Sequence, residues 1–274
     1  MVNDVLFNGA GRLIPHRMAE ELPMPGSPPR SARFDGRVVV VSGAGSRDER
    51  IGNGRAAAIL LASAGARVAL LDRDRDRAQS TARMVAGGGG TSIVLEADVS
   101  EPDCCEAAVK EVVAQFGSVY GLVNNVGISS PPGTAVDVDP DEWDLGMRVN
   151  VKSMMLLSKY CLPHMIAAGG GSIVNVSSGA GPPGGPPSLL HPTAKAAVIG
   201  LTQAMARQHG RSGVRVNCVA PAGERGGWDT GHAVRFLLSD EARWITGVVF
   251  PVGAGGLSPP PGAPQDGPVQ PDGA

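Results

Sequence analysis

A cluster of glycines directly follows a short apolar run near the start of the chain. The run Arg37–Val41 is typical of a buried strand, and Gly43, Gly52 and Gly54 lead from it into the alanine-rich helical segment Asn53–Ala64. Glycines at such a junction allow a tight turn, close approach of the backbone to a pyrophosphate and close packing of helix on sheet. The first turn of the helix would direct its free N–H groups at the phosphates. The cluster therefore indicates a dinucleotide site, with a glycine-rich surface loop as the alternative.

An acidic residue stands at the second position that matters for such a site. Asp72 ends the apolar run Arg67–Leu71, about 20 residues beyond the glycines, where a carboxylate can accept hydrogen bonds from a ribose 2′-hydroxyl. The same carboxylate repels a 2′-phosphate, which favours NAD over NADP as the cofactor. Arg73 beside it could soften that preference by pairing with a phosphate. The alternative is a solvated aspartate in the charged run 72–77.

Strand-like and helix-like segments alternate along the chain around these residues. The alternation predicts parallel strands joined by right-handed crossovers, and hence an α/β fold: a Rossmann-type doubly wound parallel sheet in three layers and a single domain. The predicted strands are Arg37–Val41, Arg67–Leu71, Thr91–Glu96, Val119–Val123, Ser172–Val176, Val214–Val219 and Val248–Val252, and the predicted helices are Asn53–Ala64, Asp74–Ala86, Pro102–Phe116, Asp141–Ala168, Thr193–Gln208 and Gly231–Ser239.

The two ends of the chain differ from its middle in composition. Runs of Pro, Gly and Gln near both ends cannot bury enough apolar surface to offset the entropy of ordering them. We expect a flexible N-terminal extension over residues 1–33, an NAD(P)-binding domain over 34–257 and a disordered Pro/Gly-rich tail over 258–274.

Composition excludes several classes of function. With 42% apolar residues, 4% aromatic residues and a net charge of −2, the chain has a core but no basic, aromatic surface for nucleic acid. It lacks both a long apolar run for a membrane helix and a secretory leader, so we expect a cytoplasmic protein that binds no membrane. The four cysteines, none in a CxxC pair, suggest no metal site.

From Phe34 to Gly256 the chain resembles a short-chain dehydrogenase/reductase (SDR). The resemblance is carried by several motifs in the family's order and spacing: Asp98-Val99, Asn124-Asn125-Val126-Gly127, Asn150 in RVNVKS, Ser178 after SIVNVS, and Lys195 in TAKAAVIGLT. It implies an oxidoreductase that transfers a hydride between NAD(H) and a secondary alcohol or carbonyl compound.

The resemblance also implies a role for each matching residue. Ser178 would orient the substrate oxygen, Lys195 would bind the nicotinamide ribose and Asn150 would hold a water in the proton relay. A homodimer or homotetramer is implied, paired through the helices matching Asp141–Ala168 and Thr193–Gln208. The expected cofactor contacts are Gly43, Ser46, Gly52, Gly54, Asp72, Asp98, Val99, Asn125, Val126, Gly127, Lys195 and Pro221.

One departure from the family falls on its catalytic tyrosine. The family carries Tyr-x-x-x-Lys, whereas this chain has His191 four residues before Lys195. Histidine exchanges protons near neutral pH, and a lysine cation nearby favours its neutral form, a base for alcohol oxidation but a poor acid for carbonyl reduction. Its nitrogen lies roughly 2 Å closer to the backbone than a phenol oxygen, and a misplacement of about 1 Å can cost on the order of a hundredfold in rate. Pro192 favours the first helical position, so His191 is predicted to cap that helix with extended backbone.

Two further departures lie in loops. The interval from Gly43 to Gly52 is longer than in the family, and we expect a longer loop that still binds the cofactor. After the sixth strand, the segment 221–228 replaces the family's helical substrate lid, which leaves no segment to exclude water. The departures from the family affect catalysis and substrate binding, whereas the cofactor motifs are nearly complete. Two alternatives therefore stay open: a redox-inactive dinucleotide-binding partner or sensor, and a non-redox lyase or isomerase with His191 as its base.

Overall fold

The computed structural model describes residues 33–46, 50–129, 133–179, 188–222 and 227–253. Apart from Arg33, the predicted N-terminal extension lies outside these residues, and so does the predicted C-terminal tail. Among the helices of the described ranges, none is both long and apolar enough to cross a membrane.

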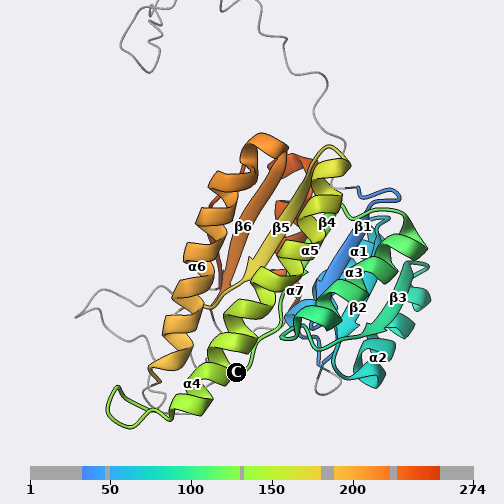
Figure 1. The fold of residues 1–274 in the computed structure, drawn as a ribbon. Coiled ribbons are helices and arrows are strands. Elements are labelled where there is room, and N and C mark those ends of the chain that lie inside the picture. Colours follow the sequence, from blue (N-terminus) through green and yellow to red (C-terminus); the bar gives the residue numbers. More distant parts are fainter. Residues whose placement is uncertain (1–32, 47–49, 130–132, 180–187, 223–226, 254–274) are drawn as a thin grey trace, which may run out of the picture. The chain divides into compact units, whose positions relative to one another are not determined.

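Seven parallel strands form one sheet in the order β3-β2-β1-β4-β5-β6-β7 (Figure 1). The first strand, β1, lies in the middle of the sheet, with β2 and β3 following on one side of it. Strand β4 lies on the other side of β1, and β5, β6 and β7 follow from there to the opposite edge. Ligands of such sheets bind at the carboxyl ends of the strands where the order reverses, which here is between β1 and β4. The strands are β1 (Val38–Ser42), β2 (Arg67–Asp72), β3 (Thr91–Glu96), β4 (Gly121–Asn124), β5 (Gly171–Val176), β6 (Val214–Pro221) and β7 (Val249–Val252).

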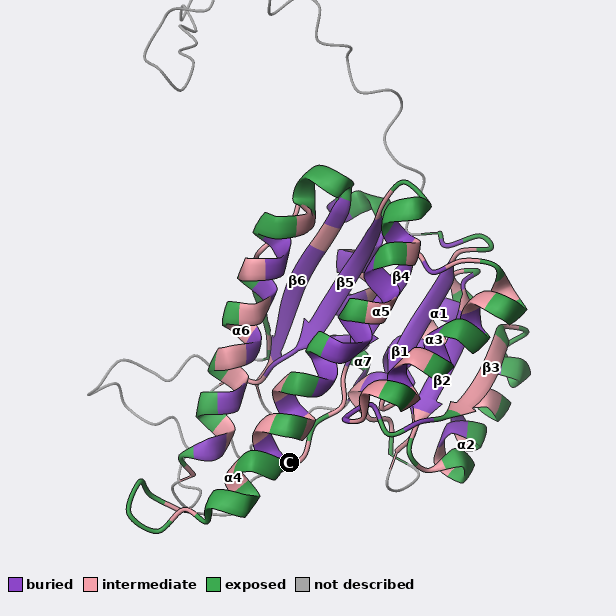
Figure 2. Cartoon of the chain, in the orientation of Figure 1, coloured by how far each residue is buried: buried purple, intermediate pink, exposed green. Residues whose placement is uncertain are grey.

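Helices cover both faces of the sheet and give the predicted three layers. Side chains alternate across β1: Val38 and Val40 belong to the core beneath α3, α5 and α6, whereas Val39 and Val41 belong to the core beneath α1, α2 and α7. The central strands are accordingly buried on both faces (Figure 2). The helices are α1 (Asn53–Ser63), α2 (Arg75–Gly87), α3 (Pro102–Phe116), α4 (Pro140–Met147), α5 (Ser153–Ala167), α6 (Leu190–His209) and α7 (Gly227–Leu238).

The predicted doubly wound fold is confirmed, with three local corrections. The single helix predicted over 141–168 is α4, a π-helical turn over Arg148–Lys152, and α5. The last helix begins at Gly227, four residues earlier than Gly231. Helix α6 begins at Leu190, so His191 lies in its first turn and does not cap it in extended backbone. Pro192 is accommodated at the third helical position because first-turn residues have no intrahelical acceptor for their N–H groups.

Candidate active site

The turn after β1 brings backbone together too closely for any side chain. Gly43 has a φ of +61°, a region that favours glycine, and a Cβ there would lie 3.1 Å from Asn125 Nδ2. A Cβ on Gly54 would collide with the carbonyl oxygen of Gly43. The first turn of α1 therefore rests directly on the turn that follows β1, which is the close packing of helix on sheet that a pyrophosphate site needs.

The N-terminus of α1 has no side-chain cap. The residue before it, Gly52, has no side chain that could accept from the helix, and the first turn contains no acidic residue. Its N–H groups and the positive end of the helix dipole are thus available to an anion. These features, together with the cradle at Gly43 and Gly54, fit the phosphates of a dinucleotide.

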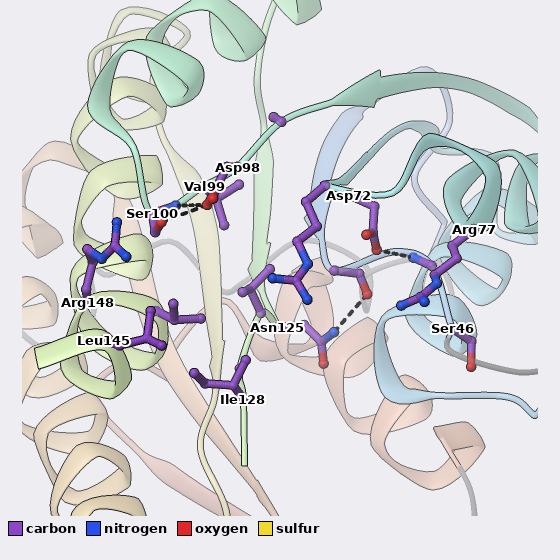
Figure 3. Close-up of a pocket in the computed structure, with 17 residues that line it drawn as sticks. Ser46, Asp72, Arg77, Asp98, Val99, Ser100, Asn125, Ile128, Leu145 and Arg148 are labelled. Atoms are coloured by element: carbon purple, nitrogen blue, oxygen red, sulfur yellow. Dashed lines mark hydrogen bonds between the residues drawn. The ribbon is translucent and has the colours of Figure 1, made fainter. Parts of the chain in front are cut away.

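Asp72 lies at the end of β2 and is already tied into the backbone around it. Its Oδ2 accepts a hydrogen bond from Gly45 N at 2.9 Å (Figure 3), and its Oδ1 accepts one from Asp74 N at 3.1 Å. A carboxylate has about four acceptor positions, so two remain for a ligand's hydroxyl groups. The hydrogen bond from Gly45 N also holds the glycine turn against the carboxyl end of β2.

A cavity of about 370 Å³ opens at the carboxyl ends of β1, β2, β3 and β4 (Figure 3). A cavity of this size, apolar in part and lined by a few polar groups, is typical of a small-molecule site. Its lining residues are Gly43, Gly45, Ser46, Asp72, Arg73, Arg77, Ala97, Asp98, Val99, Ser100, Asn125, Val126, Gly127, Ile128, Leu145, Arg148 and Val149.

The carboxyl of Asp98, on one side of this cavity, has a lowered pKa. Burial acts to raise the pKa of its carboxyl, but hydrogen bonds from the Ser100 hydroxyl (2.7 Å) and the Ser100 N–H (2.9 Å) lower it below the ordinary value. The cations Arg148 and Arg73 act in the same direction. Asp98 is thus a fixed anionic acceptor, flanked by two cations, on the wall opposite the glycine turn.

Gly127, which lines the cavity, lies beside two of the side chains that the family resemblance marks as catalytic. A Cβ on Gly127 would lie 2.9 Å from Asn150 Oδ1 and 3.3 Å from Lys195 Nζ, so these two groups meet at that glycine. Asn150 is fully buried; its Oδ1 accepts from Ile128 N, and its Nδ2 donates to Gly146 O at 3.0 Å. Lys195 Nζ donates to Val176 O at 3.2 Å.

The π-helical turn explains how Asn150 reaches this place. A π turn shifts backbone hydrogen bonds from i−4 to i−5 and frees carbonyl groups of the preceding turn. The Nδ2 of Asn150 donates to one such carbonyl, that of Gly146, four residues back, and so satisfies a buried acceptor. The turn and the asparagine side chain therefore stabilise each other.

His191 and Lys195 lie one helical turn apart near the start of α6. Burial lowers the pKa of the His191 imidazole, and the Lys195 cation lowers it further. Burial also lowers the pKa of the Lys195 ammonium. His191 thus stays neutral to a lower pH than an ordinary histidine, which suits it to accept a proton.

Ser178 lies just past the end of β5. Its hydroxyl donates to Gly179 O at 2.7 Å, and Gly179 N donates to Pro221 O at 2.7 Å, which brings the ends of β5 and β6 together. Residues 180–187, which separate Ser178 from α6, lie outside the described ranges. So do residues 47–49 of the extended glycine loop and 223–226 of the segment in place of the lid.

Eight predicted cofactor residues line the cavity: Gly43, Ser46, Asp72, Asp98, Val99, Asn125, Val126 and Gly127. Gly52, Gly54, Lys195 and Pro221 are not among its lining residues; Gly54 packs against the turn at Gly43, and Lys195 Nζ would lie 3.3 Å from a Cβ on Gly127. Sequence reasoning missed Leu145, Arg148 and Val149, although their spacing of three and four residues on a helix is the signal that they share a face. Within the described residues, no group of His, Cys, Asp or Glu side chains could hold a metal ion.

The fold and cavity define an α/β protein of the dinucleotide-binding type, and comparison with known proteins identifies the family. Residues 37–230 match the short chain dehydrogenase family. An uncharacterized oxidoreductase of Thermotoga maritima is 40% identical over 188 residues, 69% of this chain and 72% of that protein. The 2-(S)-hydroxypropyl-CoM dehydrogenase 3 of Xanthobacter autotrophicus is 34% identical, over 82% of this chain and 98% of its own.

The solved structures agree. A 7α-hydroxysteroid dehydrogenase complexed with NADH and 7-oxo glycochenodeoxycholic acid superposes with a TM-score of 0.75 at 27% identity, covering 82% of this chain and 96% of that one. The chain belongs to the short-chain dehydrogenase/reductase family, whose members are oxidoreductases that bind NAD(P).

Proposed function

We propose that the protein transfers a hydride between NAD(H) and a small secondary alcohol or carbonyl compound, with His191 in the place of the family's tyrosine. The observation that carries the proposal is the continuity of the cavity, which runs from the glycine turn past Asp72 and Asp98 to Gly127, where Lys195 and Asn150 meet. Two similar proteins support the substrate class by their names: one is a 2-(S)-hydroxypropyl-CoM dehydrogenase, and the other was solved with a 7-oxo steroid.

Each end of the cavity has a distinct task in this proposal. The turn at Gly43 and the N-terminus of α1 bind the pyrophosphate, while Asp72 accepts from the adenosine ribose and disfavours a 2′-phosphate. When bound, the nicotinamide supplies the hydride acceptor or donor. Lys195 binds the nicotinamide ribose, Ser178 orients the substrate oxygen, His191 accepts its proton, and Asn150 holds the water that relays the proton onward.

The first experiment is a fluorescence titration of the purified protein with NADH and with NADPH, alongside the variant Asp72→Ala. We expect NADH to bind more tightly than NADPH, because the Asp72 carboxylate repels a 2′-phosphate. Asp72→Ala should weaken NADH about tenfold, the effect of losing a hydrogen bond to a charged acceptor, and should narrow the difference between the two nucleotides. Asp76→Ala, a change of an exposed carboxylate in the same charged run, is the matched control. A wild-type protein that binds neither nucleotide would contradict the proposal.

The role of His191 is tested by His191→Tyr and His191→Ala, with NAD reduction measured on a panel of secondary alcohols. If the histidine carries the proton, both variants lose turnover while their NADH affinity stays unchanged. Increased turnover in His191→Tyr would instead identify a dehydrogenase that has lost its tyrosine. Binding of NADH without turnover in the wild type or either variant would favour the redox-inactive binding protein. The observation that supports this alternative is the short link of five residues between β6 and α7.

A further inference from the structure

A fully buried arginine stands beneath the cofactor cavity without lining it. Arg55, in the first turn of α1, is 1% exposed and is the largest fully buried side chain among the described residues. Burial of a guanidinium is costly unless its donors are satisfied, so its partners show what it holds in place.

The contacts of Arg55 span both sides of the extended glycine loop. Its Nη1 donates to Arg50 O at 3.2 Å, where the loop meets α1. Its Nε donates to the hydroxyl of Thr81 at 3.1 Å, and that buried hydroxyl in turn donates to Ala44 O at 2.7 Å, where the loop leaves β1. One planar guanidinium thereby links the start of the loop, its end and α2.

The neighbouring backbone depends on the same arrangement. Ala44 N donates to Leu71 O at 3.1 Å and Gly45 N donates to Asp72 Oδ2 at 2.9 Å, so a displaced Ala44 would move the carboxylate that faces the ribose. Gly45 packs closely against α2, because a Cβ there would lie 2.6 Å from Arg77 Cβ. A shift of the loop therefore changes the cavity wall itself.

We propose that Arg55, acting with Thr81, is a positioning residue for the cofactor: it holds the glycine turn and the loop end in the geometry that binds the pyrophosphate. The inference rests on the proposed dinucleotide site but assigns a new role to a residue that touches no ligand. It also explains why α1 begins with a buried cation, although a helix N-terminus ordinarily disfavours one.

The test combines NADH affinity with hydrogen exchange of the cofactor-free protein, in the variants Arg55→Lys, Arg55→Met and Thr81→Val. We expect the Kd for NADH to rise on the order of tenfold in both Arg55 variants and severalfold in Thr81→Val, because each removes a buried hydrogen bond. Amides of residues 44–46 and 50–52 should exchange faster in all three, while kcat at saturating NAD stays unchanged. Arg55→Lys keeps the charge and loses the planar fork, so it separates geometry from electrostatics.

Arg215→Met is the matched control. Arg215 is a half-buried arginine that also donates to backbone carbonyls, but it lies near the amino end of β6, whereas the cavity lies at the carboxyl ends of β1–β4. It should lower the stability of the protein and leave both the NADH affinity and the loop exchange unchanged. If Arg215→Met raised the Kd as much as Arg55→Met, the effect would be general destabilisation and the inference would be wrong.

Two further outcomes would overturn the inference. One is a folded Arg55→Lys protein with wild-type affinity and exchange, since charge alone would then suffice. The other is a Thr81→Val protein that is unchanged in both measurements, which remains decisive even if the Arg55 variants fail to fold. If the wild type binds no NADH, the proposed function fails, whereas the exchange measurement still decides whether Arg55 holds the loop.

Discussion

The imidazole of His191 and the ammonium of Lys195 lie one helical turn apart on α6 and interact electrostatically. Two effects act on the imidazole in the same direction: burial and the nearby cation both lower its pKa. A tyrosine beside the same lysine would respond in a useful but different way, because a cation favours the charged phenolate. The lysine therefore promotes proton acceptance by either residue, by favouring the anion of one and the neutral form of the other.

This coupling makes a prediction about Lys195→Met, measured by NMR titration of the histidine ring protons, with His191→Gln to assign the resonance. Removing the cation should raise the pKa of His191 toward its usual value of about 6.5. The shift should be partial, because burial is the larger cause and remains. Lys110→Met, a change of an exposed lysine on α3, should leave the titration unchanged. An unaltered pKa in Lys195→Met would contradict the coupling.

The same pKa shift predicts the pH profile of the wild-type enzyme. Proton acceptance needs the neutral imidazole, so alcohol oxidation should fall only as the pH drops through the lowered pKa of His191. The acidic limb of kcat/KM should accordingly lie below about pH 6.5. A limb above that value would mean that another group controls the reaction.

Among single residues, the sequence reveals those whose chemistry is visible in the local pattern. Asp72 is evident because it ends an apolar run after a glycine cluster. Arg55 is not, since an arginine in an alanine-rich helix is ordinarily a solvated side chain, and only the packing of α2 over α1 buries it. Arg148 could not be predicted as a cavity residue either, because the cavity that it lines forms only when α4 packs over the strand ends.

At the scale of elements, the C-terminal end of α7 is held by several side chains, of which Arg215 makes the most hydrogen bonds; the hydroxyl groups of Tyr120 and Ser172 also donate to Leu238 O and Leu237 O. Arg215 donates to Leu237 O at 2.7 Å and to Ser239 O at 3.0 Å, with longer bonds to Leu238 O and Ile245 O. The last carbonyls of a helix have no intrahelical partner and carry partial negative charge, so the half-buried guanidinium of Arg215 both pairs with them and offsets their charge.

We therefore predict that Arg215→Met lowers the free energy of unfolding by about 1.5–3 kcal/mol, since it removes charge-assisted hydrogen bonds to Leu237 O and Ser239 O. Urea denaturation followed by circular dichroism would measure it. The matched control is Arg33→Met, which removes an exposed arginine whose ion pair with Asp35 lies in solvent. That change should have no measurable effect. Equal stability of the two variants would mean that the guanidinium of Arg215 is not needed at this helix end.

The order and type of the elements could be predicted from apolar runs and glycine breaks, but two helix details could not. The π turn at Arg148–Lys152 contains neither proline nor glycine, and it depends on hydrogen bonds of Asn150 to Ile128, which is distant in sequence. Helix α6 starts three residues before the predicted Thr193 because Pro192 tolerates the third helical position as well as the first. Leu190, which packs against Gly146 of α4, extends the helix by tertiary contact.

For the molecule as a whole, the expected homodimer or homotetramer remains a prediction. Helix α5 presents Met155 and Ile166 to solvent, each about two-fifths exposed, on one of the two helices expected to pair. Met155→Glu should shift the mass measured by light scattering toward the monomer, because a buried carboxylate without a partner is costly at an apolar interface. Met84→Glu, a change of a similarly exposed residue on α2, should not. A monomeric wild type would contradict the expectation.

Helix α7 packs against helix α1. Gly227 N of α7 donates to Ile51 O beside the glycine loop at 2.8 Å, and a Cβ on Gly231 would approach Ala56 of α1 to 3.0 Å. During synthesis, the apolar face of α1 therefore leaves the ribosome long before its cover exists. A nascent chain that ends before α7 exposes that face to chaperones or to other chains. The end of the glycine loop at Ile51 likewise gains its contact with Gly227 only after α7 has been synthesised.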